Sequence, residues 1–316
     1  MVAHPPPSGR TGQWRAPHRY GGLALHGPDD PDYCVVHTRF RLRFGTVIPL
    51  LAISIYIDPN IFFLGPFTLS WHGLFSAIGV IAGVSLGVRI AAEAGVNEDG
   101  AYNLALWSVA GGIVGARLFH VWDNWGYYST NLLQIVMINE GGIAIYGAIV
   151  GGILTGTIYA RMTGIDVAKM TDGGAVGLIL GQAIGRIGDV INGEHHGLPL
   201  ESSLAVVYTH PNTLGEMGLP VHLAVGYELV WDMLVFGLLM LLRGRARFGV
   251  IFWLYVALYA VGRFWISFYR VDAIQALGLS QAQLVAVVGV VLGVAALGWM
   301  GLRGGYRREP IADLAS

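Results

Sequence analysis

The stretch GGAVGLILGQAIGRIGDVI, Gly173–Ile191, decides how the rest of the sequence is interpreted. It approaches the length of about 20 apolar residues that a helix needs to cross the hydrocarbon core of a bilayer. Its glycines recur four residues apart, at Gly177, Gly181 and Gly185, a spacing that lets two helix backbones approach closely in a membrane. It also carries Arg186, and charged groups in a membrane mark functional sites. We therefore predict a closely packed membrane helix with functional polar groups near one end.

The composition of the whole chain agrees with a membrane protein. Of the 316 residues, 54% are hydrophobic and only 12% are charged, and the mean hydropathy is +0.57. A soluble domain carries about 25% charged residues. The net charge of -1 gives no sign of a nucleic-acid partner. Cys34 is the only cysteine, which excludes a disulfide framework and a cysteine-rich zinc site.

Seven segments are long and apolar enough to span a bilayer, so we predict an all-α polytopic membrane protein with about seven transmembrane helices. The predicted spans are approximately Leu69–Ile90, Ala101–Val121, Gly142–Met162, Gly173–Ile191, Leu223–Leu242, Phe248–Phe268 and Gln283–Leu302. The preceding segment Val47–Leu64 contains Asp58 and Pro59 and is interpreted as interfacial, with an eighth span as the alternative. Residues 1–45 are polar and rich in turn residues, so we expect a disordered extension without chemistry, followed by a transmembrane domain over residues 46–316.

Lysine and arginine follow alternate spans, which indicates the orientation of the chain in the membrane. These residues are Arg89 after the first span, Arg161 and Lys169 after the third, Arg243, Arg245 and Arg247 after the fifth, and Arg303, Arg307 and Arg308 after the seventh. Because positively charged loops stay in the cytoplasm, we predict a cytoplasmic C-terminus and an N-terminus outside. The arginines of residues 1–45 have the opposite tendency.

With this orientation, six predicted spans bring polar side chains to the outer half of the membrane. They are His72, Arg117, His120, Tyr146, Arg186, Asp189, Tyr227, Glu228, Arg263 and Arg270. Guanidinium groups present planar sets of donors that suit a phosphate group. We therefore predict a site for a phospholipid headgroup in the outer leaflet, and the alternative is a salt-bridge network that only stabilises the helix bundle.

The segment GRIGDVINGEHHG, Gly185–Gly197, is the densest group of polar residues in the chain. A metal site formed by His195, His196 and His222 is one interpretation. Adjacent histidines chelate one ion poorly, however, and the chain has no HExxH pattern. We therefore predict no metal site.

The same segment closely resembles the signature of the prolipoprotein diacylglyceryl transferase family, and the resemblance covers most of residues 56–310. The other similar blocks, in the family's order, are IDPNIFFLGPFTLSWHGL, GGIVGARLFHVWDNW, EGGIAIYGAIVGG, HLAVGYELVWDMLVF and GRFWISFYRVDA. The resemblance implies a seven-helix enzyme of the bacterial inner membrane. It implies transfer of the diacylglyceryl group of phosphatidylglycerol to the lipobox cysteine of preprolipoprotein signal peptides, with release of glycerol phosphate. This lipidation is the first step of lipoprotein biosynthesis, and the family uses no metal or soluble cofactor.

Individual positions can be carried over from the family's motifs. Arg186 matches the phospholipid-binding arginine of the signature and Arg263 a second essential arginine, so we expect both to contact the phosphate. The expected substrate-binding residues are Arg117, Arg186, Asp189, Asn192, Glu194, Gly197, Tyr259 and Arg270. The catalytic set is completed by His72 and Tyr146.

Four positions depart from the family's usual pattern. Asp189 stands where asparagine is usual, Ser267 where many members have glutamate, Tyr146 where a histidine is often proposed as the base, and His72 where tyrosine is usual. We expect His72 to take the thiol proton and Tyr146 to donate a hydrogen bond. The alternative is that neither transfers protons and the arginines lower the pKa of the thiol.

Two other functions remain open from the sequence. One is a divergent paralogue that uses another acceptor. The other is a phospholipid or anion transporter, which would place charges at several depths and show inverted repeats.

Overall fold

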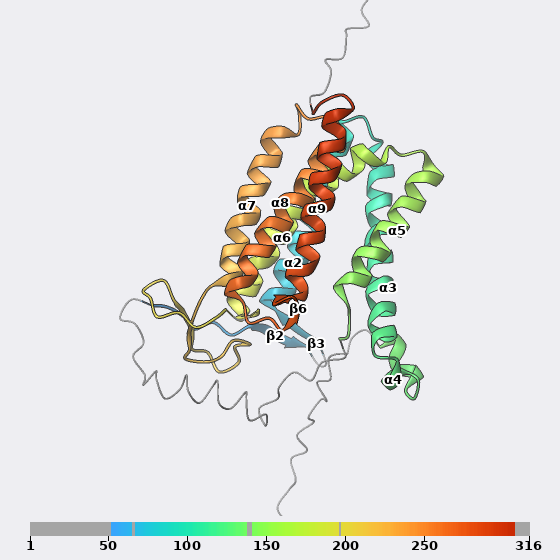
Figure 1. The fold of residues 1–316 in the computed structure, drawn as a ribbon. Helices are drawn as coiled ribbons and strands as arrows, with labels where there is room; N and C mark the ends of the chain where they lie inside the picture. Colours follow the sequence, from blue (N-terminus) through green and yellow to red (C-terminus); the bar gives the residue numbers. More distant parts are fainter. Residues whose placement is uncertain (1–51, 65–66, 138–140, 196, 307–316) are drawn as a thin grey trace, which may run out of the picture. The chain divides into compact units, whose positions relative to one another are not determined.

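The computed structural model describes residues 52–64, 67–137, 141–195 and 197–306. The expected extension, residues 1–45, lies outside the described residues. Seven long helices dominate the described part of the chain (Figure 1). They are α2 (Trp71–Glu93), α3 (Glu98–Asp123), α5 (Ile145–Thr163), α6 (Val167–Asn192), α7 (Ala224–Leu242), α8 (Val250–Ile266) and α9 (Gln281–Leu302).

Six of these helices, all except α5, are long and apolar enough to cross a membrane. The chain is therefore a multi-pass membrane protein. The third expected span is present as the helix α5, which contains four glycines, two internal threonines and Arg161 and is not among these six candidates. The described residues thus contain six candidate spans rather than the seven that we predicted.

Short strands occur at the ends of the helices, which the all-α prediction did not include. The described residues contain two β-hairpins and one three-stranded sheet, with the sheet order β1-β4-β5. The strands are β1 (Ile53–Ile55), β2 (Asn60–Leu64), β3 (Phe67–Ser70), β4 (Val206–Tyr208), β5 (Pro220–Val221), β6 (Ile274–Ala276) and β7 (Leu279–Ser280). Because β1 and β2 fall within Val47–Leu64, the alternative of an eighth helical span there is wrong for its described part. Asp58 and Pro59 separate these two strands and disfavour a continuous helix.

The helices α2 and α6 pack along a row of glycines, as the glycine spacing predicted. A Cβ atom added to Gly79, Gly83 or Gly87 would lie 2.5 to 3.0 Å from a backbone carbonyl oxygen of α6. The partners on α6 are the glycines at 181, 177 and 173, and the contact is reciprocal. Side chains at these positions would force the backbones apart, so the sequence spacing directly sets the separation of α2 and α6.

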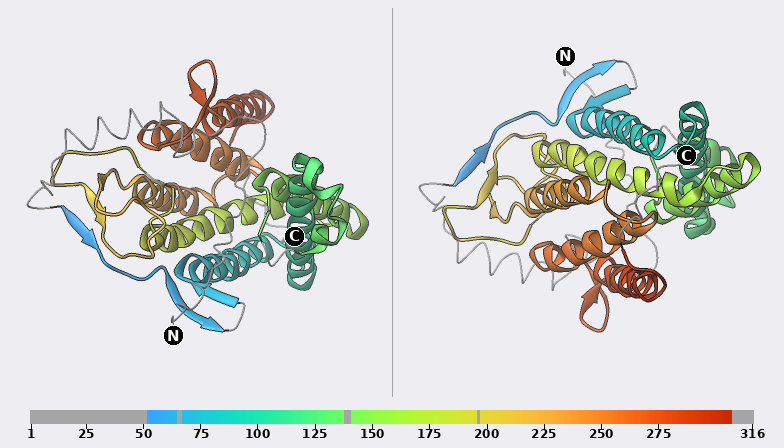
Figure 2. Two further views of the ribbon diagram at one scale, coloured as in Figure 1. Left: turned by 90° about the horizontal axis from the view of Figure 1, so that it is seen from below. Right: turned by 90° about the horizontal axis from the view of Figure 1, so that it is seen from above.

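A second pair, α3 and α5, is built in the same way. A Cβ atom on Gly115 would lie 2.4 Å from the carbonyl oxygen of Gly147, and one on Gly151 would lie 2.3 Å from that of Gly111. Figure 1 and the two views of Figure 2 show α3 and α5 together at one side of the helices α2, α6, α7, α8 and α9. Two glycine-lined helix pairs therefore form the frame of the domain.

Buried Asp172 fixes the start of α8 against α6. Its carboxylate accepts hydrogen bonds from the backbone N–H groups of Gly249 and Phe252, both at 2.8 Å. These N–H groups belong to the first turn of α8, where no backbone partner is available and negative charge is favourable. A charged residue inside an apolar helix here has a structural role.

Successive long helices run in opposite directions, so alternate helix ends meet. The start of α2, the end of α6, the start of α7 and the end of α8 lie at one end of the bundle, next to the segment 193–223 (Figure 1). We call this the site end. Gly193 closes α6 there with a left-handed conformation (φ 75°), and a Cβ atom on it would lie 2.6 Å from Oγ1 of Thr213. Glycine is therefore required where the chain leaves α6.

Candidate active site

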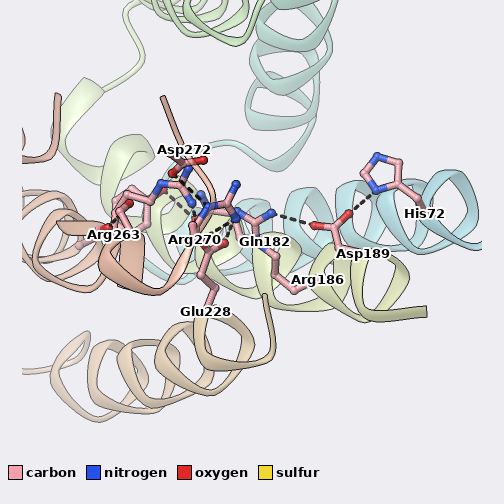
Figure 3. A network of polar contacts seen from close by, with 10 residues as sticks. His72, Gln182, Arg186, Asp189, Glu228, Arg263, Arg270 and Asp272 are labelled. Carbon is pink, nitrogen blue, oxygen red and sulfur yellow. Dashed lines mark hydrogen bonds and ion pairs between the residues drawn. The ribbon is translucent and has the colours of Figure 1, made fainter. Parts of the chain in front are cut away.

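Three arginines surround the carboxylate of Glu228 at the site end (Figure 3). Arg186 Nη2 forms an ion pair with Oε2 at 2.7 Å, Arg263 Nη1 donates a hydrogen bond to Oε1, and Arg270 Nη1 lies 3.4 Å from Oε1. Glu228 lies about one turn after the start of α7 and is 4% exposed. Residues from α6, α7, α8 and the following chain thus meet at one carboxylate.

The charges around Glu228 are not balanced by that residue alone. Three guanidiniums face one carboxylate, and the additional carboxylates lie at the edges, where Asp189 pairs with Arg186 and Asp272 with Arg270. Burial, together with repulsion from Arg263, lowers the pKa of Arg270. An anion between the guanidiniums would face three positive groups and the single carboxylate of Glu228, while Asp189 and Asp272 bring the whole cluster to three positive and three negative side chains.

Arg263 has donors to offer to such an anion. Of its contacts with described residues, the side chain makes one hydrogen bond, from Nη1 to Glu228. A guanidinium has five N–H donors in a planar arrangement. Glu228 therefore holds the group in place, and most of its donors form no hydrogen bond with a described residue.

Asp189 connects this cluster to His72. Arg186 Nη1 donates to Oδ2 of Asp189 at 2.8 Å, and Nδ1 of His72 lies 2.5 Å from Oδ1 of the same carboxylate. Glu194 lies 3.7 Å from His72 Nδ1 and accepts a hydrogen bond from Asn192 Nδ2 at 3.0 Å. Four residues of the signature segment, from Arg186 to Glu194, therefore form one continuous polar chain with the start of α2.

Gly197 has a backbone role at the site. A Cβ atom on it would lie 1.9 Å from the carbonyl oxygen of His222, so no other residue fits. Gly197 also forms a β-bridge with Arg270, and the neighbouring Leu198 N–H donates to the carbonyl of Tyr269 at 2.9 Å. This glycine thus lets the segment after α6 pack against the backbone that carries Arg270.

Arg117 does not join the other arginines. All five of its N–H donors go to backbone carbonyls of the segment after α3 and before α5. The acceptors are the carbonyls of Gln134, Ile135, Met137, Gly141 and Gly142. The side chain is buried and also lies over the ring of Tyr128, with 5.3 Å between the guanidinium carbon and the ring centroid. This arrangement fits a structural role better than the expected contact with lipid.

The two expected tyrosines have different surroundings. Tyr259 stacks on Tyr255, with ring centroids 5.9 Å apart, and packs against the apolar core while lying near the charges of Arg186 and Arg263. Tyr146 lies at the start of α5 and makes no hydrogen bond or ring contact with a described residue. The structure therefore brings His72, but not Tyr146, into contact with the polar chain.

Glu228, the central acceptor, was expected among the polar groups of the site but not in its substrate-binding or catalytic sets. Two further residues were in none of these sets: Asp272 pairs with Arg270 at 3.3 Å, and Asp232 lies one turn further along α7 with a buried Oδ2 that has no hydrogen-bond partner among the described residues. The sequence signal for Glu228 and Asp232 is the i, i+4 spacing of acids on one face of an apolar helix. No comparable signal marks Asp272, which lies in a polar turn.

One group of side chains has the spacing of a metal site. The ligand atoms of His72, Asp189 and Glu194 lie within 4.8 Å of one another. Both oxygens of Asp189 already have partners, and one of these partners is the positively charged Arg186, which would repel a metal cation. His222, from the other possible metal set, instead forms a hydrogen bond with Tyr227 at 3.2 Å.

Comparison with known proteins places the chain in one family. The family model described as prolipoprotein diacylglyceryl transferase matches residues 59–299. Proteins named phosphatidylglycerol--prolipoprotein diacylglyceryl transferase are similar over most of their length. The one from Trichormus variabilis is 36% identical over 279 residues, which cover 85% of this chain and 97% of the relative. The one from Clostridioides difficile is 36% identical over 245 residues, which cover 76% of this chain and 94% of the relative. This chain, with its arginine cluster at one end of a glycine-packed helix bundle, therefore belongs to the prolipoprotein diacylglyceryl transferase family.

Proposed function

We propose that this membrane protein transfers the diacylglyceryl group of phosphatidylglycerol to the lipobox cysteine of preprolipoproteins. Family membership supports this reaction, because the relatives carry it in their names. The observation that supports it most directly is the convergence of Arg186, Arg263 and Arg270 on Glu228. The acceptors are signal peptides of preprolipoproteins, and no cofactor takes part.

The phosphate of the lipid headgroup binds to Arg186 and Arg263. Guanidinium groups bind phosphate oxygens in pairs, and Arg263 has open donors at the site. Glu228 keeps these two side chains close together, and Arg270 adds a third positive charge. Tyr259 lies on the apolar side of the cluster, where the acyl chains of the lipid enter the bundle.

The reaction replaces a carbon–oxygen bond by a carbon–sulfur bond. The cysteine sulfur attacks the glycerol carbon next to the phosphate, and glycerol phosphate leaves with the electrons of the broken bond. Negative charge grows on the leaving phosphate, and arginines already fixed in an apolar site stabilise it strongly. A thiol has a pKa of about 8.5, so a base accelerates the reaction at neutral pH. His72 accepts the thiol proton, and Tyr146 contributes a hydrogen bond from α5.

The orientation follows from the charged loops. The site end faces the outside of the bacterial inner membrane, the C-terminus lies in the cytoplasm, and α5 serves as the seventh membrane helix beside the six candidate spans. In this orientation the arginines reach headgroups of the outer leaflet, and the lipobox cysteine of an exported precursor would meet the lipid there. A transporter is less well supported, because the arginine cluster lies at one end of the bundle and does not continue along its length.

The test is transfer from phosphatidylglycerol to a synthetic lipobox peptide, measured with protein in lipid nanodiscs. Arg186→Ala and Arg263→Ala should each reduce the rate by about 10²–10³, the loss typical of one group that stabilises transition-state charge. Arg243→Ala is a matched control, because Arg243 pairs with Glu93 at 2.6 Å near the opposite end of its helix. Near-normal transfer by either site variant would refute the phosphate assignment. Lipid transfer only to another acceptor would identify a divergent paralogue.

A further inference from the structure

His72 and Asp189 both depart from the usual pattern of the family, and they are in direct contact. Nδ1 of His72 lies 2.5 Å from Oδ1 of Asp189, and Arg186 holds the other carboxylate oxygen (Figure 3). We propose that Asp189 is a positioning residue that orients His72 as the base for the acceptor thiol. This inference rests on the proposed transfer reaction and adds the residue through which its base is held.

The contact fixes which nitrogen of His72 can accept a proton. A carboxylate has no hydrogen to donate, so the hydrogen shared with Asp189 belongs to Nδ1 of the neutral imidazole. The lone pair then lies on Nε2, on the opposite side of the ring. A carboxylate in this position selects the tautomer and the ring orientation, as it does where histidines serve as bases or metal ligands.

The two side chains also differ in exposure: a base must be accessible to the thiol, whereas the carboxylate that orients it must be held in place. The side chain of Asp189 is 3% exposed, whereas that of His72 is 43% exposed. The carboxylate is therefore fixed inside the protein, and the imidazole reaches the surface of the site, where a peptide thiol can approach Nε2. Other charged groups near His72 are Glu194 and Arg186.

Asp189 further links the base to the phosphate site. Its two oxygens join His72 and Arg186, at 2.5 and 2.8 Å respectively. In the lipid, the attacked carbon is separated from phosphorus by one oxygen atom. The thiol must come to about 3–3.5 Å from that carbon before it reacts. Because Asp189 joins the base to a phosphate-binding arginine, both groups can act on one lipid molecule, with the arginine at the leaving phosphate and the base at the attacking thiol.

The packing of α2 on α6 brings the pair together. A Cβ atom on Gly188 would lie 2.6 Å from Cα of His72 and 2.8 Å from the carbonyl oxygen of Trp71. Gly188 precedes Asp189 directly, so the absence of a side chain there lets the first turn of α2 reach the carboxylate. The glycine row that runs through Gly83 and Gly177 fixes the same two helices further along.

The proton balance of the step is simple. The thiol proton moves from sulfur to Nε2 of His72 as the carbon–sulfur bond forms and the carbon–oxygen bond to phosphate breaks. The imidazolium, which Asp189 stabilises, then releases the proton to water at the site end. Asp189 stays ionised and does not touch the substrate.

A double-variant cycle at pH 7 tests whether Asp189 acts through His72. His72→Gln and Asp189→Asn should each lower the transfer rate at least about tenfold, a modest part of the range for general base catalysis. With His72→Gln already present, Asp189→Asn should cause less than about a twofold further loss, because residues that act as a unit are not additive. An equal loss in both backgrounds would overturn the proposal, because Asp189 would then serve the phosphate site or the fold. His222→Gln is a matched control at the same end of the bundle and should be active.

The pH dependence gives a second readout that a structural role would not change. At pH 9.5 most of a thiol with a pKa of about 8.5 is already ionised. The defects of His72→Gln and Asp189→Asn should therefore largely disappear there, whereas that of Arg186→Ala should persist. A defect of Asp189→Asn that is equally large at both pH values would contradict the proposal.

A chelation experiment separates the pair from a metal site. Wild-type transfer should be unchanged by EDTA, and a loss that zinc restores would assign His72, Asp189 and Glu194 to a metal ion instead. If the proposed transferase function itself were wrong, the result would be different, because the wild-type protein would then transfer no lipid to the peptide. An active wild-type enzyme with additive His72 and Asp189 effects refutes only the present inference.

Discussion

Substitution of Gly177 by alanine tests whether the glycine contact between α2 and α6 controls the site. The added Cβ atom would lie 2.1 Å from the carbonyl oxygen of Gly83, whereas ordinary contacts begin near 3.4 Å. The two backbones would therefore have to move apart by about 1 Å, because neither contact atom belongs to a flexible side chain. Overpacking of this kind costs about 1–3 kcal/mol of folding stability.

A control is needed because alanine also stabilises a helix relative to glycine, by about 1 kcal/mol. Gly174→Ala provides it, since Gly174 lies on the same helix and a Cβ atom there meets nothing within 4 Å. Comparison of the two variants removes the common gain in helix propensity. We expect Gly177→Ala to be less stable than Gly174→Ala by about 1–3 kcal/mol.

Thermal unfolding in detergent, followed by tryptophan fluorescence, measures this difference. Transfer activity gives a second consequence, because separation of α2 from α6 would lengthen the 2.5 Å contact between His72 and Asp189. Gly177→Ala should therefore lose activity even at temperatures where it stays folded. If Gly177→Ala melts at or above the temperature of Gly174→Ala and keeps full activity, the glycine contact does not set the helix separation.

Two other predictions concern the orientation and the structural arginine. A reporter fused after Arg308 should be active only in the cytoplasm, and one inserted within residues 202–220 only outside. The reverse pattern would show that the arginines do not face the outer leaflet. Arg117→Ala should leave several backbone carbonyls without donors, cost about 2 kcal/mol of stability and increase proteolysis of residues 129–144. A higher KM for phosphatidylglycerol with unchanged proteolysis would show instead that Arg117 contacts the lipid.

The sequence predicted the helices well because their signals are local. Each long helix is an apolar segment, and its length is imposed by the thickness of the bilayer rather than by distant contacts. The glycine spacing similarly predicted close helix packing, since a missing side chain has the same consequence wherever the partner lies. The short strands were not predicted, because runs of two to five residues that pair across the chain carry almost no periodicity.

The sequence also singled out the three arginines that contact Glu228, because charge in an apolar segment is conspicuous. It could not separate their roles. Arg117, Arg186 and Arg263 look alike in sequence, since each is an arginine near the end of a span. Only the tertiary structure distinguishes the arginine that binds five carbonyls from the two that share Glu228.

The same distinction applies to the proposed base. The sequence places a histidine at position 72, a tyrosine at position 146 and an aspartate at position 189, and only the resemblance to the family suggested that these residues are unusual there. Residues 72 and 189 are separated by more than a hundred positions, so no local pattern relates the two changes. The close packing of α2 on α6 brings Nδ1 of His72 to 2.5 Å from Oδ1 of Asp189. Tyr146, on α5, forms no hydrogen bond with a described residue. Composition and spacing thus determined a membrane helix bundle with an arginine site, whereas the choice of partners within that site depended on helix packing, because hydrogen bonds act only over the short distances that packing creates.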